Sequence, residues 1–483
     1  MNTIKAAIVT PVLSPARQNT ILAICCLSLL AVSMDATIVN VALPDIRRDL
    51  DASLRGLQWV IDAYTIVLAT FLMLGGSMAD RFGRRRVFQA GMALFTFGSL
   101  LCSLAGSVGT LVAARVIQAL GGSMMNPVAM SIIVQTFTEP KARARAIGIW
   151  AAVAGLAMAL GPLTGGILTQ TLGWHAIFWI NVPIGVLALW SMWRYVPESR
   201  APKARRFDPV GQVLLLVGLA ALVFAVIESG RGPVIAGAAG VVSATAFAGL
   251  VAYEGRRREP LLDLRFFHSL PFSSATVIAI CMFAALGGFL FLSSLYLQDV
   301  RGLSAFQAGM GILPAALTVT VVSPLSGRLV GAHGARPSLL VSGVMLALSA
   351  LCLTQLQPDT SLVALFVVYA AFGIGFGMVN APVTFAAVSG MPRAQAGIAS
   401  AVASTSRQIG VSIGVALAGA VAGHDAAGGT SAFAQATHRF WWLLVVLGVV
   451  IVWLAFLSTG ARARASTDRI AHLLQEPEPG KAA

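Results

Sequence analysis

The sequence predicts an all-α protein that crosses a membrane many times. Of its 483 residues, 57% are hydrophobic and only 11% are charged, whereas soluble domains carry roughly 25% charged residues. The apolar residues occur in unbroken runs of about 20, which is the length that a helix needs to cross a bilayer. A membrane barrel would instead show alternating segments of about 10 residues.

Apolar runs bounded by charged residues, glycine or proline define the predicted spans. The sequence predicts fourteen of them, at 20–43, 57–79, 86–106, 109–136, 143–170, 176–196, 209–228, 232–253, 272–298, 306–330, 337–356, 361–386, 396–422 and 438–459.

The distribution of basic residues predicts the orientation of these spans. Most of the 33 Lys and Arg residues lie in or beside the alternate tails and loops that include the N-terminus, and only Arg115 and Arg407 lie deep inside spans. Because cytoplasmic loops carry the excess of positive charge, we expect both termini to be cytoplasmic. The net charge of +14 therefore reflects membrane topology and does not indicate nucleic-acid binding.

Charged linkers divide the chain into two bundles. We expect a cytoplasmic tail (1–19), retained and not a cleaved signal, a six-helix bundle (20–196), a linker (197–208), an inserted helix pair (209–253), a second linker (254–271), a second six-helix bundle (272–459) and a cytoplasmic tail (460–483). The second linker interleaves apolar and charged residues at 260–267. It is either a short amphipathic helix at the inner interface or a solvated basic loop.

Two sequence patterns occur once in each bundle. Gly76-x3-Asp80-x2-Gly83-x-Arg85 is matched in spacing by Gly327-x3-Gly331-x2-Gly334-x-Arg336, and 121–127 resembles 375–382. Weak internal repetition of this kind is typical of a transporter built from two parallel halves, with its binding site between them near the middle of the membrane.

Three ionisable residues lie inside the predicted spans of the first half. With a helix rise of 1.5 Å per residue, Asp35 lies roughly 12 Å, Asp62 roughly 8 Å and Arg115 roughly 9 Å from the outer surface. If they face one cavity, one carboxylate pairs with the guanidinium and the other stays in apolar surroundings, so the group can bind and release a proton. The alternative is a static ion-paired cluster. Asp62 lies near enough to the interface for partial hydration.

The turn after the second span combines glycines, an aspartate and arginines. Positive charge alone would set topology, but topology requires neither the aspartate nor the glycines, so the pattern favours a gate at the inner surface. Its candidate residues are Gly76, Asp80, Arg81, Gly83, Arg84 and Arg85. Glu139 is a candidate second acidic partner for these arginines.

The fifth span carries a glycine-proline cluster. A proline inside a span kinks the helix, and small residues allow helices to pack closely, so we expect a bent and tightly packed outer seal. Its residues are Gly161, Pro162, Gly165 and Gly166.

Several polar residues in the spans are candidates for a substrate cavity. Arg407 lies near the middle of the membrane, and its partner is backbone carbonyls, an acid of the first half or an anionic group of a substrate. The other candidates, each of which more often has a structural role, are Tyr64, Gln118, Asn126, Tyr296, Tyr369 and Asn380.

No pattern indicates a metal site, a cofactor or an enzyme. All five cysteines lie inside predicted spans without the spacing of a metal site or a disulfide framework, and no His/Cys/acid cluster or soluble domain suggests catalysis or signalling.

Taken in order, these motifs resemble the major facilitator superfamily and, within it, the fourteen-span drug:proton antiporter family of the QacA/EmrB type. The resemblance covers nearly the whole chain. The matching segments are 35–44, Trp59-Val60-x3-Tyr64, Gly76-x3-Asp80-Arg81-x-Gly83-Arg84-Arg85, Arg115-x2-Gln118, Gly161-Pro162-x2-Gly165-Gly166, 177–185, 260–264 and Arg407-Gln408-x-Gly410.

The resemblance implies a major facilitator fold and transport by alternating access. It assigns protonation to Asp35, protons or cationic substrate to Asp62, a place in the proton relay to Arg115 and inner-gate control to the Asp80 turn. The Gly161-Pro162 motif is typical of exporters. The sequence departs from the family pattern at Ala119, Ala157 and Gly331. Gly331 replaces the acid in the second copy of the turn and suggests asymmetric gate control.

We therefore expect a multi-pass, proton-coupled antiporter of a bacterial cytoplasmic membrane that exports lipophilic, cationic drugs or toxic compounds. The alternative is a dedicated exporter of one endogenous metabolite, peptide or lipid. The expected partners are small-molecule substrates, protons and the lipid bilayer, with accessory efflux proteins as further candidates. A proton gradient would drive transport without a cofactor.

Overall fold

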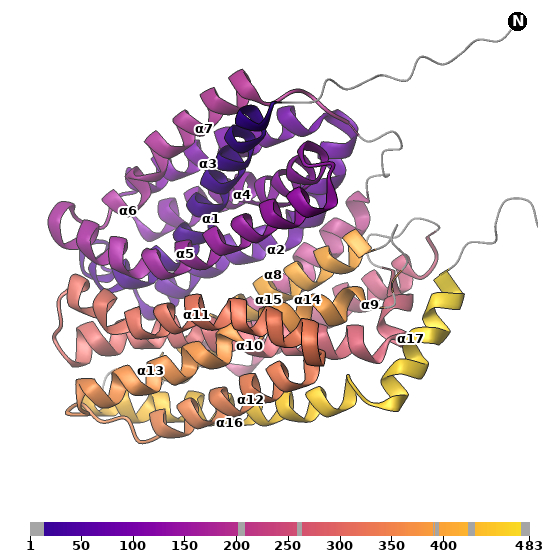
Figure 1. The fold of residues 1–483 in the computed structure, drawn as a ribbon. Helices are drawn as coiled ribbons and strands as arrows, with labels where there is room; N and C mark the ends of the chain where they lie inside the picture. Colours follow the sequence, from indigo (N-terminus) through magenta and orange to yellow (C-terminus); the bar gives the residue numbers. More distant parts are fainter. Residues whose placement is uncertain are drawn as a thin grey trace, which may run out of the picture.

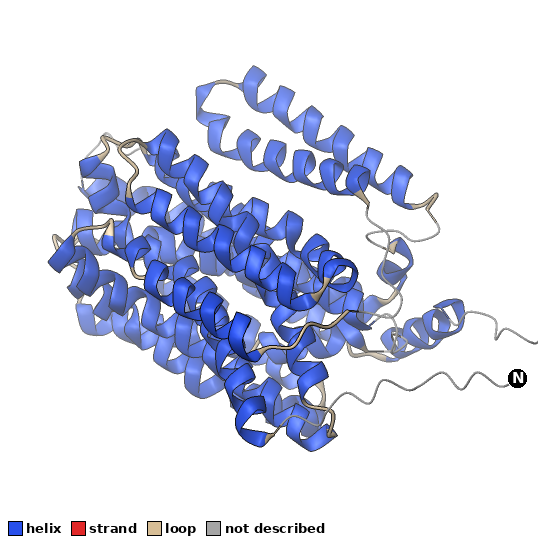
Figure 2. Ribbon diagram, turned by 90° about the horizontal axis from the view of Figure 1, so that it is seen from above, coloured by secondary structure: helices blue, strands red, loops and turns tan. Residues whose placement is uncertain are grey.

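The computed structural model describes residues 14–200, 208–257, 263–389, 391, 396–423 and 430–474. In this part of the chain every regular element is a helix, and no strand occurs (Figure 2). The α-helices are α1 (Pro15–Asp49), α2 (Leu54–Phe82), α3 (Arg84–Ser103), α4 (Val108–Thr136), α5 (Pro140–Leu172), α6 (Ala176–Trp179), α7 (Asn181–Tyr195), α8 (Pro209–Ile227), α9 (Pro233–Glu254), α10 (Leu270–Leu295), α11 (Ala305–His333), α12 (Ala335–Leu353), α13 (Leu362–Gly377), α14 (Asn380–Val388), α15 (Ala396–Gly423), α16 (Thr430–Leu457) and α17 (Ala461–Leu474).

The helices confirm the predicted all-α, multi-pass class. Eleven candidate spans are long and apolar enough to cross a membrane, and α5 is a twelfth if its two parts, which meet at 40°, count as one span. Helices α3 and α15 occupy two further predicted spans without belonging to this set. The total of fourteen spans stays a prediction.

Two predicted spans are broken where an asparagine and a proline follow each other closely. The span at 176–196 divides into α6 and α7, and the span at 361–386 divides into α13 and α14. Pro183 and Pro382 each lie in the first turn of the second segment, where the missing N–H of proline is tolerated. The sequence patterns show both prolines but not the breaks.

The helices form two groups that lie side by side. Figure 1 shows α1 to α7 in the upper part and α10 to α16 in the lower part, with α5 directly beside α11. Helix α2 packs on α15, and α8, the first helix of the predicted insertion, lies against both α2 and α15. We call the end of the bundle that carries the Gly83 turn the inner end, following the predicted orientation, and the opposite end the outer end.

The repeated glycine pattern forms the same local structure twice. Gly83 joins α2 to α3 with φ 110°, and Gly334 joins α11 to α12 with φ 78°. Glycine adopts such left-handed backbone conformations without the steric cost that other residues meet. Each half therefore contains a long helix, a glycine turn and a second helix at the corresponding place.

The second linker is described at residues 254–257 and 263–271. Its later part forms one 3₁₀ turn, η2 (Leu264–His268), which Asp263 caps by accepting a hydrogen bond from Arg265 N at 3.0 Å. Phe266 is fully buried and its ring lies 5.5 Å from that of Phe272 on α10. The turn is thus anchored on the second half, while 260–262 lie outside the described residues.

Candidate proton-coupling and substrate site

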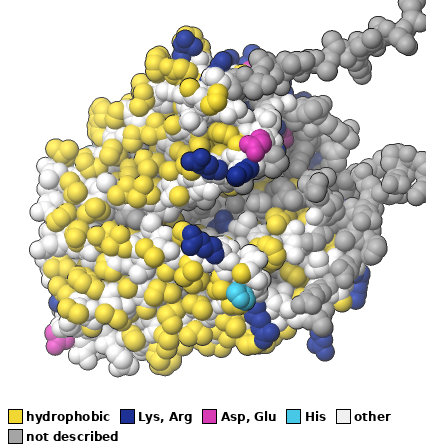
Figure 3. Space-filling view, in the orientation of Figure 1, with side chains coloured by type: hydrophobic (Ala, Val, Ile, Leu, Met, Phe, Trp, Pro, Cys, Tyr) yellow, Lys and Arg dark blue, Asp and Glu magenta, His cyan; other side chains and the backbone are white. Residues whose placement is uncertain are grey.

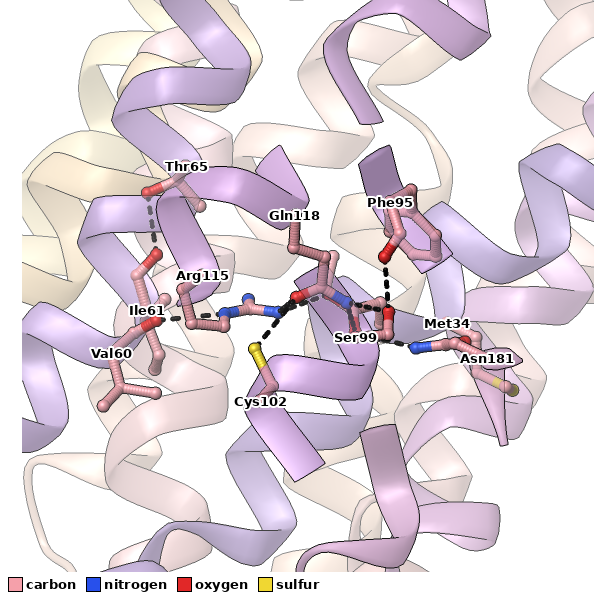
Figure 4. Close-up of polar contacts among 12 residues, drawn as sticks. Met34, Val60, Ile61, Thr65, Phe95, Ser99, Cys102, Arg115, Gln118 and Asn181 are labelled. Carbon is pink, nitrogen blue, oxygen red and sulfur yellow. Dashed lines mark hydrogen bonds and ion pairs between the residues drawn. The ribbon is translucent and has the colours of Figure 1, made fainter. Parts of the chain in front are cut away.

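Asp35 of α1 and Arg115 of α4 form a buried ion pair. Arg115 Nη1 lies 2.5 Å from Asp35 Oδ2, and the two side chains are 2% and 0% exposed. Arg115 Nη1 also donates to Gln118 Oε1 at 2.7 Å, and its Nε donates to the carbonyl of Val60 on α2 at 3.2 Å (Figure 4). The guanidinium therefore links three helices of the first half.

The second oxygen of Asp35 accepts hydrogen bonds from two amide side chains. Gln118 Nε2 donates to Oδ1 at 2.8 Å and Asn181 Nδ2 donates at 3.1 Å. Gln118 Nε2 also donates to Ser99 Oγ at 2.8 Å. A buried ion pair is tolerated only when further hydrogen bonds compensate for lost hydration, and these amides supply them. Asn181 and Ser99 were not predicted; the available signal was a polar side chain inside an apolar run.

An aromatic wall covers one side of the ion pair. The guanidinium carbon of Arg115 lies 3.9 Å from the ring centre of Tyr64 and 5.8 Å from that of Phe178. A guanidinium over an aromatic face is attracted by the electrons of the ring. Tyr64 and Gln118 were predicted as cavity residues, but here they hold the ion pair.

Asp62 of α2 lies apart from this pair. It is fully buried, not partly hydrated as the sequence suggested. Its Oδ1 accepts a hydrogen bond from Ser412 of α15 at 2.9 Å, and its Oδ2 has no partner among the described residues. No Lys or Arg of the described part of the chain pairs with it. The structure thus places the carboxylate without a cation at the contact between the two halves.

The inner turn is held by an acid that the motif does not contain. Asp80 Oδ1, near the end of α2, lies 3.2 Å from Nη2 of Arg84, which begins α3. Glu198 Oε1 accepts a hydrogen bond from Arg85 N at 3.0 Å, and a Cβ at position 83 would lie 2.5 Å from the same oxygen. Glycine at position 83 is therefore required both for its backbone conformation and for the approach of Glu198.

The remaining residues of the turn lie around this contact. Arg86 Nε lies 3.7 Å from Glu198 Oε2, Gly76 faces Pro127 of α4, and Arg81 lies beside the ring of Phe82. The proposed partner Glu139 is exposed and precedes α5, and it forms no ion pair with the described arginines. In this conformation Glu198, from the end of the first half, takes the place suggested for Glu139.

The glycine-proline cluster of α5 lies against α1 and α11 at the outer end. A Cβ on Gly161 would overlap the side chain of Thr37, and a Cβ on Gly165 would lie 2.9 Å from the carbonyl of Ile38. A Cβ on Gly166 would lie 2.6 Å from the carbonyl of Ala305 on α11. Only glycine permits backbones to approach so closely, so the predicted tight packing is present.

An apolar cavity of about 40 Å³ lies between the two halves on the inner side of this seal. Thr37 is the polar side chain in its wall, and the aromatic rings come from α10 and α13. Its lining residues are Thr37, Gly155, Met158, Pro162, Leu286, Phe289, Leu290, Ile312, Ala315, Ala316, Val319, Phe372 and Phe376.

The other predicted cavity residues also lie outside this lining. Tyr369 packs edge-on against Phe289, with ring centres 4.8 Å apart, and so stands behind the wall. Tyr296 donates from its hydroxyl to the carbonyl of Gln357 at 2.5 Å. Asn380 begins α14, and Asn126 of α4 is half-buried with Oδ1 lacking a partner among the described residues.

Arg407 has no carboxylate partner in the described part of the chain. Its Nη2 donates to Thr384 Oγ1 at 2.7 Å, and its Nε is buried without a hydrogen-bond partner there. Phe283, 5.9 Å from the guanidinium, lies between Arg407 and the cavity residue Phe376. An acid of the first half is not its partner in this conformation.

Two related helical halves with a cavity between them are the architecture of many membrane transporters. The sequence matches the Major Facilitator Superfamily over residues 25–415. The chain therefore belongs to this superfamily, as its motifs suggested, while the fourteen-span subfamily stays a prediction.

Similar proteins are named for drug resistance. The chain is 40% identical over 401 residues to the multidrug resistance protein Stp of Mycobacterium tuberculosis, covering 82% of this chain and 74% of the relative. It is 36% identical over 393 residues to the tetracenomycin C resistance and export protein of Streptomyces glaucescens, covering 80% and 73%.

Solved structures support the fold alone. A bacterial homologue of the human lysosomal transporter Spinster aligns with a TM-score of 0.67 at 18% identity, covering 95% of this chain and 99% of that one. A D-xylose–proton symporter aligns with a TM-score of 0.66 at 14% identity, covering 91% and 97%.

Proposed function

We propose that this protein is a proton-coupled antiporter of a bacterial cytoplasmic membrane that exports lipophilic compounds, cationic ones among them, by alternating access. The proposal rests on the different environments of two buried carboxylates. Asp35 is paired with Arg115, whereas Asp62 has no cation among the described residues. Ionisable groups inside membrane proteins are costly and generally mark ion or substrate pathways.

The geometry supplies a way to couple a proton to movement of the helices. Protonation of Asp35 would remove the charge that holds Arg115, whose other bonds reach Gln118 on α4 and the carbonyl of Val60 on α2. Asp62 lies two residues beyond Val60, at the contact with Ser412 of α15. A change at the ion pair is thereby linked to the contact between the halves.

The cavity supports the choice of substrate class. Its wall is apolar and aromatic apart from Thr37, so it favours the apolar body of a substrate through burial of apolar surface. Within the spans of the first half, Asp35 and Asp62 face only one cation, Arg115, which supports acceptance of cations when Asp62 is ionised.

The outward direction rests on the outer seal and on the relatives. The close contacts of Gly161 and Gly166 with α1 and α11 close the outer end in this conformation. The names of two similar proteins refer to resistance or export. Glu198 and the Asp80 turn, at the inner end, would govern closure there.

The proposal is tested by driving transport with an imposed proton gradient in everted vesicles, with ethidium as the probe. Asp35→Asn should abolish gradient-driven ethidium uptake into the vesicles, and Asp62→Asn should reduce it at least tenfold. Asp359→Asn, at an exposed aspartate, is the matched control and should behave like the unchanged protein. Gradient-driven transport by Asp35→Asn at the normal rate would refute the coupling.

A dedicated exporter is the second candidate, because some similar proteins are named for a single antibiotic, such as the puromycin resistance protein of Streptomyces alboniger. Competition separates the two functions. A multidrug carrier should show mutual inhibition among chemically unrelated lipophilic compounds, whereas a dedicated exporter should respond to one compound and its close analogues.

A further inference from the structure

We propose that lipophilic substrates reach the cavity from the inner leaflet of the membrane through one lateral opening, between α5 and α11, because α8 covers the corresponding opening between α2 and α15. This inference rests on the proposed export function. It adds the route by which substrates enter and the side of the molecule on which they do so. Two seams separate the halves, one between α2 and α15 and the other between α5 and α11. Their packing differs.

Helix α8 is packed into both halves at the α2/α15 seam. Gln212 of α8 donates a hydrogen bond to the backbone carbonyl of Thr70 on α2, and both residues are buried. Nearer the outer end, Arg55 of α2 lies 3.9 Å from Glu228, directly after α8, and the rings of Trp59 and Phe224 are 6.1 Å apart. These contacts hold α8 along much of the length of α2.

A hydrophobic cluster of its own fills the space between α8, α2 and α15. Ile66 and Ala69 of α2, Leu215 and Leu219 of α8, and Ala416 of α15 are all buried in it. Direct bonds between the halves also cross this seam: Gln58 Nε2 donates to the carbonyl of Ala416 at 2.9 Å. A lipid-dissolved molecule therefore meets a packed helix at this seam.

The α5/α11 seam is closed at the outer end and open further in. At the outer end a Cβ on Gly166 would collide with the backbone of Ala305 and Phe306, and a Cβ on Gly309 would collide with Pro162. Toward the inner end the glycines of the same two helices have no atom of the described residues within 4 Å of a Cβ; these are Gly148 and Gly155 on α5 and Gly327 and Gly331 on α11.

The change from close to open packing coincides with the bend of α5, where the segments ending at Met158 and beginning at Leu160 meet at 40°. The cavity is lined at this level by Gly155 and Met158 of α5 and by Ala316 and Val319 of α11. The cavity therefore lies at the level where the close packing of the seam ends.

Exposed apolar side chains of both helices lie beside the opening. Ile149 and Leu156 on α5 are 42% and 46% exposed, and Leu317 and Val321 on α11 are 54% and 74% exposed. Figure 3, which looks onto α5 and α11, shows hydrophobic side chains over much of the left of this face, with Lys and Arg near its middle, at its top and at its lower right. This surface suits a molecule with a large apolar body and a polar or charged group that stays near the inner interface.

The test compares single cysteines on the two sides of the molecule, in a chain whose own five cysteines are replaced by serine. Gly148→Cys and Gly327→Cys lie at the opening. Gly237→Cys on α9 and Val213→Cys on α8 are controls, because both positions are exposed and face away from the cavity seam. Everted vesicles are labelled with a lipid-soluble maleimide, with and without ethidium.

Ethidium should slow labelling at positions 148 and 327 by at least threefold and leave positions 237 and 213 unchanged. Equal protection at position 213 would overturn the one-sided route, and absence of protection at 148 and 327 would overturn the opening itself.

A second measurement separates this inference from the proposed function. Ethidium transport is measured in the same four variants and in Gly148→Trp and Gly237→Trp. We expect Gly148→Trp to raise the KM for ethidium at least fivefold with little change in kcat, and Gly237→Trp to change neither. Normal ethidium transport without protection of positions 148 and 327 contradicts the opening but not the antiporter function. Protection without proton-driven transport contradicts the antiporter function and supports the opening.

Discussion

The two halves share one repeated scaffold but differ in where they place charge. In the first half the turn at Gly83 is held by Asp80, Arg84 and Glu198. In the second half Gly331 stands at the position of Asp80, and Arg336 lies 4.4 Å from the ring of Phe456 instead of beside an acid. The repeat therefore preserves the backbone of the turn, while the ionic contacts found among the described residues belong to the first copy.

The arginines inside the spans show the same difference. Arg115 of the first half is paired with Asp35 and hydrogen-bonded to Gln118 and Val60. Arg407 of the second half bonds to the hydroxyl of Thr384 and to no described carboxylate. The second half contributes most of the cavity wall, including Phe289. The comparison assigns the proposed proton chemistry to the first half and most of the substrate contact to the second.

The largest expected effect is at Arg115. Arg115→Leu leaves the charge of Asp35 buried without a partner, so we expect a loss of about 3–5 kcal/mol in stability and no ethidium transport. Thermal unfolding of the purified protein in detergent measures the first effect. Asp35→Asn combined with Arg115→Leu should recover much of the stability but not the transport. Unfolding of Arg115→Leu at the normal temperature would contradict the buried pair.

Substitutions at the outer seal should have similar effects whichever half carries them. The difference between the two halves therefore does not extend to the seal. Gly166→Leu and Gly309→Leu each force a side chain into the backbone of the other half, and overpacking of this kind costs about 1–3 kcal/mol. We expect similar losses of thermal stability and transport. Gly237→Leu is the control, because its position is open. A much smaller effect of one substitution would show that the seal is one-sided.

Substitutions in the two inner turns should reduce transport to different extents. Glu198→Gln weakens a hydrogen bond to Arg85 N and the contact with Arg86, an effect of about 1–2 kcal/mol, and we expect transport to fall several-fold. Arg336→Gln removes an exposed cation from the ring of Phe456 and should change transport less than twofold. Initial rates of ethidium transport at equal protein levels measure both. Equal losses would show that both turns act as gates.

The smallest expected effect is at Arg407. Arg407→Gln removes the bond to Thr384, so we expect a loss of about 0.5–1.5 kcal/mol in thermal stability and transport of cationic dyes near the normal rate. A loss as large as that of Arg115→Leu would mean that Arg407 meets an acid in another conformation. Arg407→Lys, which keeps the charge, then tells whether charge or shape is required.

Much of the fold could be predicted from local patterns. Apolar runs, the distribution of Lys and Arg, and the repeated glycine turns predict an all-helical membrane protein with two related halves, because each pattern depends on residues close in sequence. The breaks at Ile180 and Val379 could not be predicted, because glycine and proline are common in membrane helices without breaking them. The sequence also left the partner of Arg115 open between two carboxylates.

The sequence by itself determined the membrane class, the superfamily and the residues that can carry charge at depth. Only the tertiary structure decided that Arg115 holds Asp35, that Asp62 meets Ser412 of the other half, and that Glu198 replaces Glu139 at the inner turn. It also decided that α8 fills one seam while α5 and α11 part at the other. Helix rise places residues in depth along one axis, but contacts depend on how helices rotate and pack, which residues far apart in the chain determine together.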